Sequence, residues 1–192
     1  RELDHQAAAG IDRVSNASCG EKLDQNIAGV VRRLKEKRYR AYDIRRAWIP
    51  KPDGRQRPLG ILVLEDKVVQ RGVAKILSAI YAQDFLEVSY GFREGLSGHD
   101  ALKALELSIM RNGVNYLIDV DIKGYFDHVD HKWLMRMMRE RVVDRTILWL
   151  IGKWLRVGVL EEGKRVHNEV GVPQGGVIYP LLANIYLHYV LD

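Results

Sequence analysis

Two short motifs contain the residues that could carry out chemistry. In the first, residues 120–127, Asp121 ends an apolar run and is followed by Gly124 and an aromatic residue, Phe126. A carboxylate at a strand end supplies the hard oxygen ligands that Mg²⁺ prefers, alongside the phosphate oxygens of a substrate. Two such ions about 4 Å apart would activate a hydroxyl nucleophile and stabilise a leaving pyrophosphate. Asp121 is therefore predicted to bind metal, whereas Asp119, on the same strand face, is predicted to have a structural or supporting role.

The residues after Asp121 are predicted to form a turn around a phosphate group. Successive backbone N–H groups in residues 123–126 can cradle a triphosphate, and Gly124 permits close approach of the ligand. Phe126 placed under a sugar would leave no space for a 2′-hydroxyl group. The alternative is that Phe126 is an ordinary core residue.

The second motif is the turn at residues 171–176. Pro173 sets the entry angle of this turn, and Gly175 and Gly176 expose backbone amides. The helix that follows would direct its N-terminus toward a phosphate. Gln174 carries both a hydrogen-bond donor and an acceptor, so it could contact a nucleotide.

Local patterns predict the elements that position these motifs. A period-two alternation predicts a buried strand at residues 116–122, which ends beside Asp121. Apolar residues at three- and four-residue steps predict helices over residues 21–38, 66–80, 99–111, 147–157 and 180–191, and another in the segment after the N-cap Asp130. The last helix is apolar on nearly all sides, so it should be buried.

Turn residues predict two hairpins. Pro52 and Gly54 lie between residues 46–50 and 56–61, and residues 161–164 form a second turn. Because proline cannot donate a backbone hydrogen bond, Pro50 and Pro58 indicate that the first hairpin has edge-like strands.

Composition and charge restrict the class of protein. The 192 residues are 47% hydrophobic and 29% charged, which is typical of a globular chain, and no apolar run is long enough to cross a bilayer. The net charge is +5, yet residues 32–57 hold eleven cations against three carboxylates and so carry +8, which leaves −3 for the rest. One basic lobe on a slightly acidic body indicates a phosphate-binding surface.

The cations of the basic lobe predicted to contact nucleic-acid phosphates are Arg32, Arg33, Lys35, Arg38 and Arg40. A solvated helix face is the alternative for these five residues. It explains the cations of residues 45–57 less well, because those flank a hairpin.

Other chemistries have less support. His128 and His131 lie beside Asp127 and Asp130, but no cysteine or further histidine is near enough in sequence to complete a tetrahedral zinc site. The single cysteine, Cys19, cannot form an internal disulfide, which fits a reducing, cytoplasmic location. The chain starts without a signal-peptide core or an initial methionine, which indicates a fragment boundary.

Taken in order, these motifs resemble the reverse transcriptases encoded by group II introns. The matching segments are residues 10–15, 45–61, 64–70, 89–93, 99–102, the two motifs above, and 180–187. The resemblance implies an RNA-directed DNA polymerase with a right-hand architecture, dependent on Mg²⁺. Its partners would be an RNA template, a DNA primer, dNTP and group II intron RNA, which intact relatives help to splice as maturases. No membrane partner is expected.

The resemblance also implies roles for individual residues. Asp121 would be the catalytic carboxylate, and Asp121 and Ile122 would be the metal-binding positions. The nucleotide-binding positions would be Lys51, Arg57 and Arg45 in the fingers, then Lys123, Gly124, Tyr125, Phe126, Gln174 and Gly175. The chain differs from the usual family pattern at Glu94 and Leu96, where proline and arginine are common, and at Tyr179, where serine is common.

The implied fold is α+β: fingers with an N-terminal extension at residues 1–114, then an incomplete palm at 115–192, with an antiparallel sheet packed against helices. The family's second metal-binding motif should follow the helix at 180–191. We therefore expect these 192 residues alone to be inactive. Two alternatives stay open: a non-catalytic RNA-binding maturase scaffold, and a reverse transcriptase of bacterial defence type.

Overall fold

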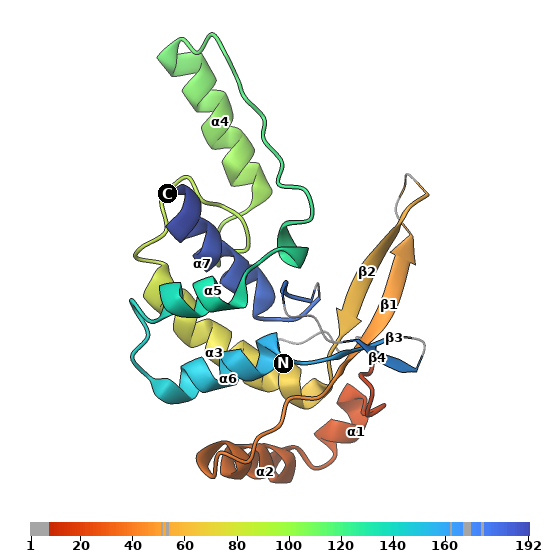
Figure 1. Ribbon diagram of the computed structural model, residues 1–192. Helices are drawn as coiled ribbons and strands as arrows, with labels where there is room; N and C mark the ends of the chain where they lie inside the picture. The colour runs from red at the N-terminus through yellow and green to blue at the C-terminus, as the bar shows by residue number, and fades with distance from the viewer. Residues whose placement is uncertain (1–7, 51, 53, 162, 167–169, 174) are drawn as a thin grey trace.

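The computed structural model describes residues 8–192, other than 51, 53, 162, 167–169 and 174. Within these residues, the elements in chain order are α1 (Asn16–Gly20), α2 (Leu23–Lys35), β1 (Ile44–Pro50), β2 (Gln56–Ile61), α3 (Leu64–Tyr81), α4 (Gly98–Asn112), the 3₁₀ turn η1 (Tyr125–Asp127), α5 (His131–Met138), α6 (Arg145–Leu155), β3 (Val159–Glu161), β4 (Lys164–Val166) and α7 (Tyr179–Leu191) (Figure 1). The α+β class is confirmed.

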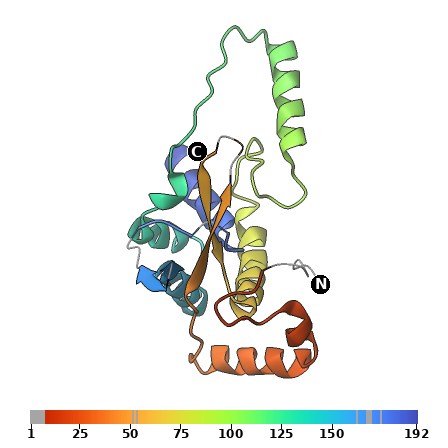
Figure 2. The same ribbon diagram turned by 90° about the vertical axis from the view of Figure 1, so that its right-hand side faces the viewer.

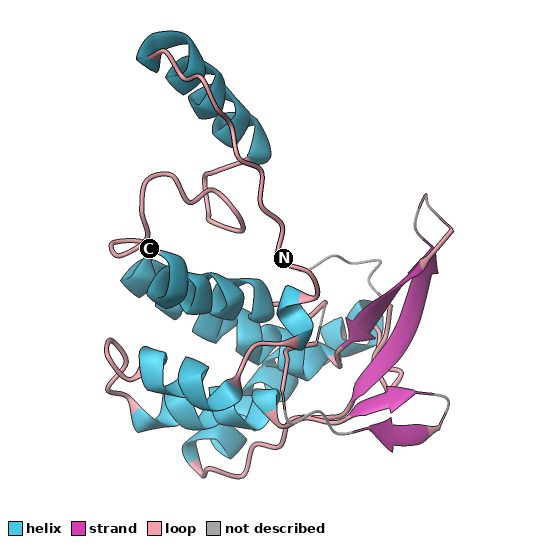
Figure 3. Cartoon of the chain, turned by 45° about the horizontal axis from the view of Figure 1, so that its top comes forward, coloured by secondary structure: helices cyan, strands magenta, loops and turns pink. Residues whose placement is uncertain are grey.

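The strands form one sheet in the order β2-β1-β3-β4 (Figure 3). β1 and β2 make the predicted antiparallel hairpin, with Gly54 in the turn at φ +80°. Pro58 lies in β2 at the sheet edge, as predicted, but β1, which ends at Pro50, is an inner strand between β2 and β3. Because β1 and β3 are parallel, the sheet is mixed and not wholly antiparallel. β3 and β4 form the second predicted hairpin.

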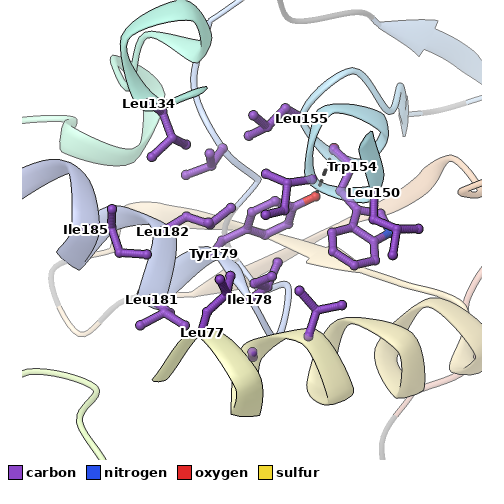
Figure 4. Packing of buried hydrophobic residues seen from close by; sticks show 14 of the residues in the cluster. Leu77, Leu134, Leu150, Trp154, Leu155, Ile178, Tyr179, Leu181, Leu182 and Ile185 are labelled. Carbon is purple, nitrogen blue, oxygen red and sulfur yellow. Dashed lines mark hydrogen bonds between the residues drawn. The ribbon is translucent and has the colours of Figure 1, made fainter. Parts of the chain in front are cut away.

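The core lies between α3, α6 and α7. Leu77, Trp154, Tyr179 and Leu182 are at most 1% exposed and come from these three helices (Figure 4). Burying side chains of this size stabilises the fold by about 1.5–3 kcal/mol each. The helix boundaries agree to within about three residues with those predicted from apolar spacing, although every residue of α2 and α4 is at least partly exposed.

A buried polar cluster joins α3 and α6 to the segment before β1. Asp66 is 1% exposed, and its carboxylate accepts hydrogen bonds from the Tyr39 hydroxyl and from the backbone N–H of Tyr42. The Tyr39 oxygen in turn accepts from Trp154 Nε1 at 3.0 Å. Burial raises the pKa of Asp66 to about 6, although the Tyr39 and Tyr42 hydrogen bonds oppose the shift. Sequence periodicity did not reveal this cluster, because Asp66 and Trp154 are each more than twenty residues away from the Tyr39–Tyr42 segment that joins them.

The predicted strand at residues 116–122 is wrong. These residues have no regular secondary structure, and the side chains expected to be buried are open to solvent: Ile118 is 86% exposed and Val120 is 77% exposed. A strand needs a partner for its backbone hydrogen bonds, and none of the described strands pairs with this segment. The alternating pattern gives residues 116–122 the character of a strand, but it does not show whether another strand is present to pair with them.

Helix α4 has the predicted extent but not the predicted packing. Ser97 and Asp100 form a capping box at its N-terminus, and Gly113 ends it in the left-handed conformation. Its apolar residues are exposed, with Leu102 at 65% and Met110 at 77%. Figure 2 shows α4 standing away from the other helices, connected by extended segments.

Helix α7 is buried at its beginning and exposed at its end. Tyr179 and Ile185 are fully buried, whereas Leu191 is 67% exposed. None of the helices among the described residues combines the length and the apolar composition that crossing a bilayer requires.

Candidate nucleotide and metal site

Several predicted site residues line one cavity of about 630 Å³. Its walls come from β2, from the segment that includes η1, and from α7. The predicted residues in its lining are Arg57, Asp121, Ile122, Gly124, Tyr125 and Phe126, and the others are Gln56, Pro58, Asp127 and Leu187. The fold thus brings a cation of β2, the candidate metal ligand and the candidate sugar-contacting ring to one place, although they span seventy residues of sequence.

Two carboxylates face this cavity. Asp121 and Asp127 both line it, and both side chains are exposed. Carboxylate oxygens are the ligands that a hard divalent cation such as Mg²⁺ takes in ones and twos, with substrate and water completing the shell. Among the described residues, no group of three or more histidine, cysteine or acidic side chains could hold a metal. The residues present therefore fit an ion shared with a phosphate ligand, not a protein cage.

The turn after Asp121 is ordered by its own backbone. Gly124 has φ +63°, the Asp127 N–H donates to the Gly124 carbonyl at 2.9 Å, and the His128 ring nitrogen Nδ1 donates to the same carbonyl at 2.8 Å. Tyr125 anchors the turn to α7, because its hydroxyl donates to the Ala183 carbonyl at 2.6 Å. Burial raises the pKa of Tyr125, so this hydroxyl stays protonated as a donor.

Phe126 is half-buried at the cavity wall. Its ring packs edge-on against the Tyr125 ring, with the centroids 5.7 Å apart, and it borders the hydrophobic core. The two roles predicted for Phe126 are compatible in this position, because one side of the ring packs while the residue still lines the cavity.

The two sequence motifs lie side by side. The Val172 N–H donates to the Phe126 carbonyl at 2.7 Å, and the Gly171 N–H donates to the Val129 carbonyl at 2.9 Å. His131 Nε2 donates to the Gly171 carbonyl at 2.6 Å. Gly171 has φ +90°, and a Cβ there would lie 2.8 Å from the Asp127 carbonyl oxygen, so only glycine fits. His131 and these two backbone hydrogen bonds therefore hold the two motifs together, whereas His128 bonds within the first motif.

The glycines of the second motif allow close packing. A Cβ on Gly175 would lie 2.6 Å from the Gly60 carbonyl oxygen in β2. A Cβ on Gly176 would lie 2.2 Å from the Tyr179 ring, so the missing side chain makes room for that ring. The Tyr179 hydroxyl donates to the Trp154 carbonyl at 3.1 Å (Figure 4). Gln174, which precedes Gly175, lies outside the described residues.

The start of α7 does not face the cavity, contrary to expectation. Ile178 and Tyr179 are fully buried among apolar residues, and α7 contributes Leu187, from its second half, to the cavity lining. The apolar first turn of this helix packs into the core, so none of its described residues lines the cavity.

The other predicted cations are placed differently. Arg45 is not among the cavity-lining residues, and its guanidinium donates to the Ala9 carbonyl at 2.9 Å, which holds the N-terminal segment against β1. Lys123 is exposed next to the turn and Asp119 is exposed before it, and neither lines the cavity. Lys51 lies outside the described residues.

The five cations proposed to bind RNA fall into two groups. Arg33 forms an ion pair with Glu65 at 2.5 Å, linking α2 to α3, and Arg38 pairs with Glu36 at 3.3 Å. Arg32, Lys35 and Arg40 are exposed. Arg33 therefore has a structural contact between two helices. RNA binding by Arg32, Lys35, Arg38 and Arg40 stays a prediction.

Sequence reasoning missed four residues of the cavity lining: Gln56, Pro58, Asp127 and Leu187. Gln56 and Pro58 flank the predicted Arg57. The sequence did contain a signal for Asp127, because it is a second carboxylate only three residues after Gly124. Leu187 had no local signal, because α7 reaches the cavity only through the tertiary fold.

Comparison with known proteins assigns the family. The family described as "Reverse transcriptase (RNA-dependent DNA polymerase)" matches residues 49–192, which include both motifs. The chain belongs to the reverse transcriptase family.

Within this family, the resemblance to group II intron proteins is confirmed. The chain is 39% identical over 166 residues to the group II intron-encoded protein LtrA of Lactococcus lactis subsp. cremoris, covering 86% of the chain and 27% of LtrA. It is 36% identical over 182 residues to protein YkfC of Escherichia coli (strain K12), covering 93% of the chain and 48% of YkfC. The chain therefore spans less than half the length of these relatives.

The fold is also found in a solved reverse transcriptase structure. The chain resembles a protein in a partial Cas6-RT-Cas1–Cas2 complex with a TM-score of 0.57 and 23% identity, covering 88% of this chain and 29% of that one. This similarity supports the fold assignment.

Proposed function

We propose that this chain is the nucleotide-binding part of an RNA-directed DNA polymerase of the group II intron type. The observation that carries the proposal is the single cavity in which Arg57, Asp121 and Phe126 converge. A cation for the triphosphate, a carboxylate for a metal ion and a ring for the sugar are the three groups that deoxynucleotide addition requires at one place.

Each residue has a proposed role in this reaction. Asp121, with Ile122 and the Asp127 carboxylate beside it, holds a divalent cation, which we propose to be Mg²⁺. When bound, Mg²⁺ supplies the Lewis-acid chemistry that activates a primer 3′-hydroxyl and stabilises pyrophosphate. The turn at Gly124 and the cations Arg57 and Lys51 bind the triphosphate of an incoming dNTP.

We also propose that the protein binds group II intron RNA and assists splicing. The support is the similarity to LtrA, together with the exposed cations Arg32, Lys35 and Arg40 on and after α2. In this proposal, RNA template and DNA primer occupy the polymerase site, and intron RNA contacts the basic lobe.

Arg57→Ala tests the assignment of the triphosphate site. In template-directed primer extension by the full-length protein, we expect KM for dNTP to rise about tenfold or more, because a charge-assisted contact to phosphate is worth about 1.5–3 kcal/mol. The dissociation constant for template RNA should change less than the KM. Steady-state kinetics and fluorescence anisotropy measure the two quantities.

Arg55→Ala is the matched control, since Arg55 lies in the same hairpin but does not line the cavity. Its KM for dNTP should stay near the wild-type value. Equal losses of nucleotide use and template affinity in Arg57→Ala would mean that Arg57 is a general phosphate contact.

Phe126→Val tests the proposed selection against ribonucleotides. Removing the ring should make room for a 2′-hydroxyl and raise the relative efficiency of rNTP use about 10²-fold, the size expected when a steric exclusion of a few kcal/mol is lost. Competing dNTP and rNTP incorporation at one template position measures the ratio. Unchanged discrimination, with dNTP addition intact, would place the sugar elsewhere.

A further inference from the structure

A second cavity of about 1240 Å³ lies between α5 and α6, away from the residues that line the nucleotide cavity. Its rim carries four cations, Lys132, Arg139, Arg145 and Arg156, and its wall includes His131 and Trp149. No residue in its lining is acidic. The two helices that form it lie next to each other below α7 in Figure 1.

This groove is the centre of a second basic region. Residues 131–156 contain seven lysines and arginines and only two carboxylates, Glu140 and Asp144, a net charge of +5. Asp144 is occupied as the N-cap of α6, where its carboxylate accepts from the N–H groups of Thr146 and Ile147. The basic lobe at 32–57 is therefore not the sole concentration of positive charge in this chain.

The four rim cations keep their charge available to a ligand. Within the part of the chain that the structure describes, none of them forms an ion pair. Arg156 donates from Nε to the Gly152 carbonyl at 2.8 Å, which fixes the side chain without neutralising it. Arg141, by contrast, is paired with Asp84 outside the groove. Several like charges along one groove raise the local potential and attract a polyanion.

The interior of the groove is apolar and aromatic. Met135, Leu148 and Leu155 line it with Trp149, and the Lys153 ammonium lies 4.4 Å from the centroid of the Trp149 ring. A single strand of nucleic acid offers phosphates to a basic rim and unpaired bases to an aromatic and apolar interior. A duplex keeps its bases stacked inside, and an acidic peptide has little to place against this interior.

We propose that the groove between α5 and α6 binds a single-stranded segment of RNA. Phosphates contact Lys132, Arg139, Arg145 and Arg156, and a base packs against Trp149. The choice of RNA over DNA rests on the proposed function, whereas the preference for a single strand rests on the groove alone. His131 lines the groove and also donates a hydrogen bond to the Gly171 carbonyl. This one residue therefore links the proposed RNA groove to the second motif of the nucleotide site.

The test compares two double variants with the same change of charge. Arg139→Gln/Arg145→Gln removes two rim cations, and Lys103→Gln/Arg111→Gln removes two exposed cations of α4. Each protein is titrated with a fluorescent single-stranded oligouridylate at several salt concentrations. The rim variant should lower the slope of log affinity against log salt by about 1.4, or about 0.7 per contact to a single strand. The α4 variant should leave the slope unchanged.

Photocrosslinking of the unmodified chain provides a second readout that does not depend on the variants. An oligonucleotide containing 4-thiouridine should crosslink to the peptide that contains Trp149. Crosslinks confined to other peptides, or equal salt slopes in the two double variants, would overturn the proposal. So would tighter binding of single-stranded DNA, a duplex or polyglutamate than of the RNA at matched charge. Failure of primer extension would leave these results intact, because none of them requires catalysis.

Discussion

Asp121→Asn is expected to lower template-directed dNTP incorporation by the full-length protein at least about 10³-fold, a change of about 4 kcal/mol in the activation barrier. The substitution keeps the size of the side chain but removes its negative charge. An uncharged amide holds a divalent cation poorly, and loss of oriented electrostatic stabilisation at a reacting centre costs several kcal/mol. Primer extension at saturating dNTP measures the effect.

Asp119→Asn is the matched control, because it makes the same chemical change two residues earlier at a side chain outside the cavity lining. It should retain most of the activity. Both variants should bind template RNA with nearly wild-type affinity, since neither carboxylate is proposed to contact RNA. If Asp119→Asn were as inactive as Asp121→Asn, the assignment of Asp121 as the metal ligand would lose its support.

Tyr39→Phe is expected to lower the free energy of unfolding by about 3 kcal/mol near neutral pH. The lost hydroxyl donates to the buried Asp66 carboxylate and accepts from Trp154 Nε1. Its removal leaves a buried charge with one partner fewer and a buried indole N–H without an acceptor. Chemical denaturation followed by circular dichroism gives the free energy.

Tyr42→Phe is the control, because the Tyr42 backbone N–H, not its hydroxyl, bonds Asp66, and the side chain is 45% exposed. It should cost less than about 0.5 kcal/mol, as expected for an exposed position. Equal losses in the two variants would mean that the buried cluster contributes nothing specific.

The same cluster predicts a pH dependence. Because burial raises the pKa of Asp66 to about 6 from 3.8, the folded chain binds a proton in this window that the unfolded chain does not. The contribution of Asp66 to the free energy of unfolding is thus present at about pH 4 and lost as the pH rises through about 6. Tyr39→Phe removes a hydrogen bond that favours the ionised form, so its cost should be larger above pH 6 than below it.

Features encoded by local sequence were predictable. The apolar residues of α3 and α7 predicted those two helices, and Gly54 predicted the turn of the first hairpin. The convergence of Asp121, Phe126 and Arg57 was also anticipated, although by resemblance to a family and not by spacing. The structure then supplied the hydrogen bonds between residues 126–131 and 171–172 that join the two motifs.

Features that depend on partners distant in sequence were not predictable. Residues 116–122 have the pattern of a strand, but a strand forms only when it pairs with another, and none of the described strands pairs with this segment. Asp66 was predicted only as the start of a helix. Its burial was not predicted, because it depends on Tyr39 and Trp154, which are distant in sequence. The groove between α5 and α6 was overlooked because its cations are dispersed along two helices and gather only when these pack.

The most direct test of the nucleotide site is metal-directed cleavage of the polypeptide. Fe²⁺ is substituted for Mg²⁺ in the full-length protein bound to primer, template and dNTP, and ascorbate and peroxide then produce hydroxyl radicals at the bound ion. The chain should be cut within residues 119–127, and Asp121→Asn should abolish these cuts while Asp119→Asn retains them. Identical cuts in Asp121→Asn, or no cleavage in this segment of the wild-type protein, would contradict the assignment of Asp121 as the metal ligand.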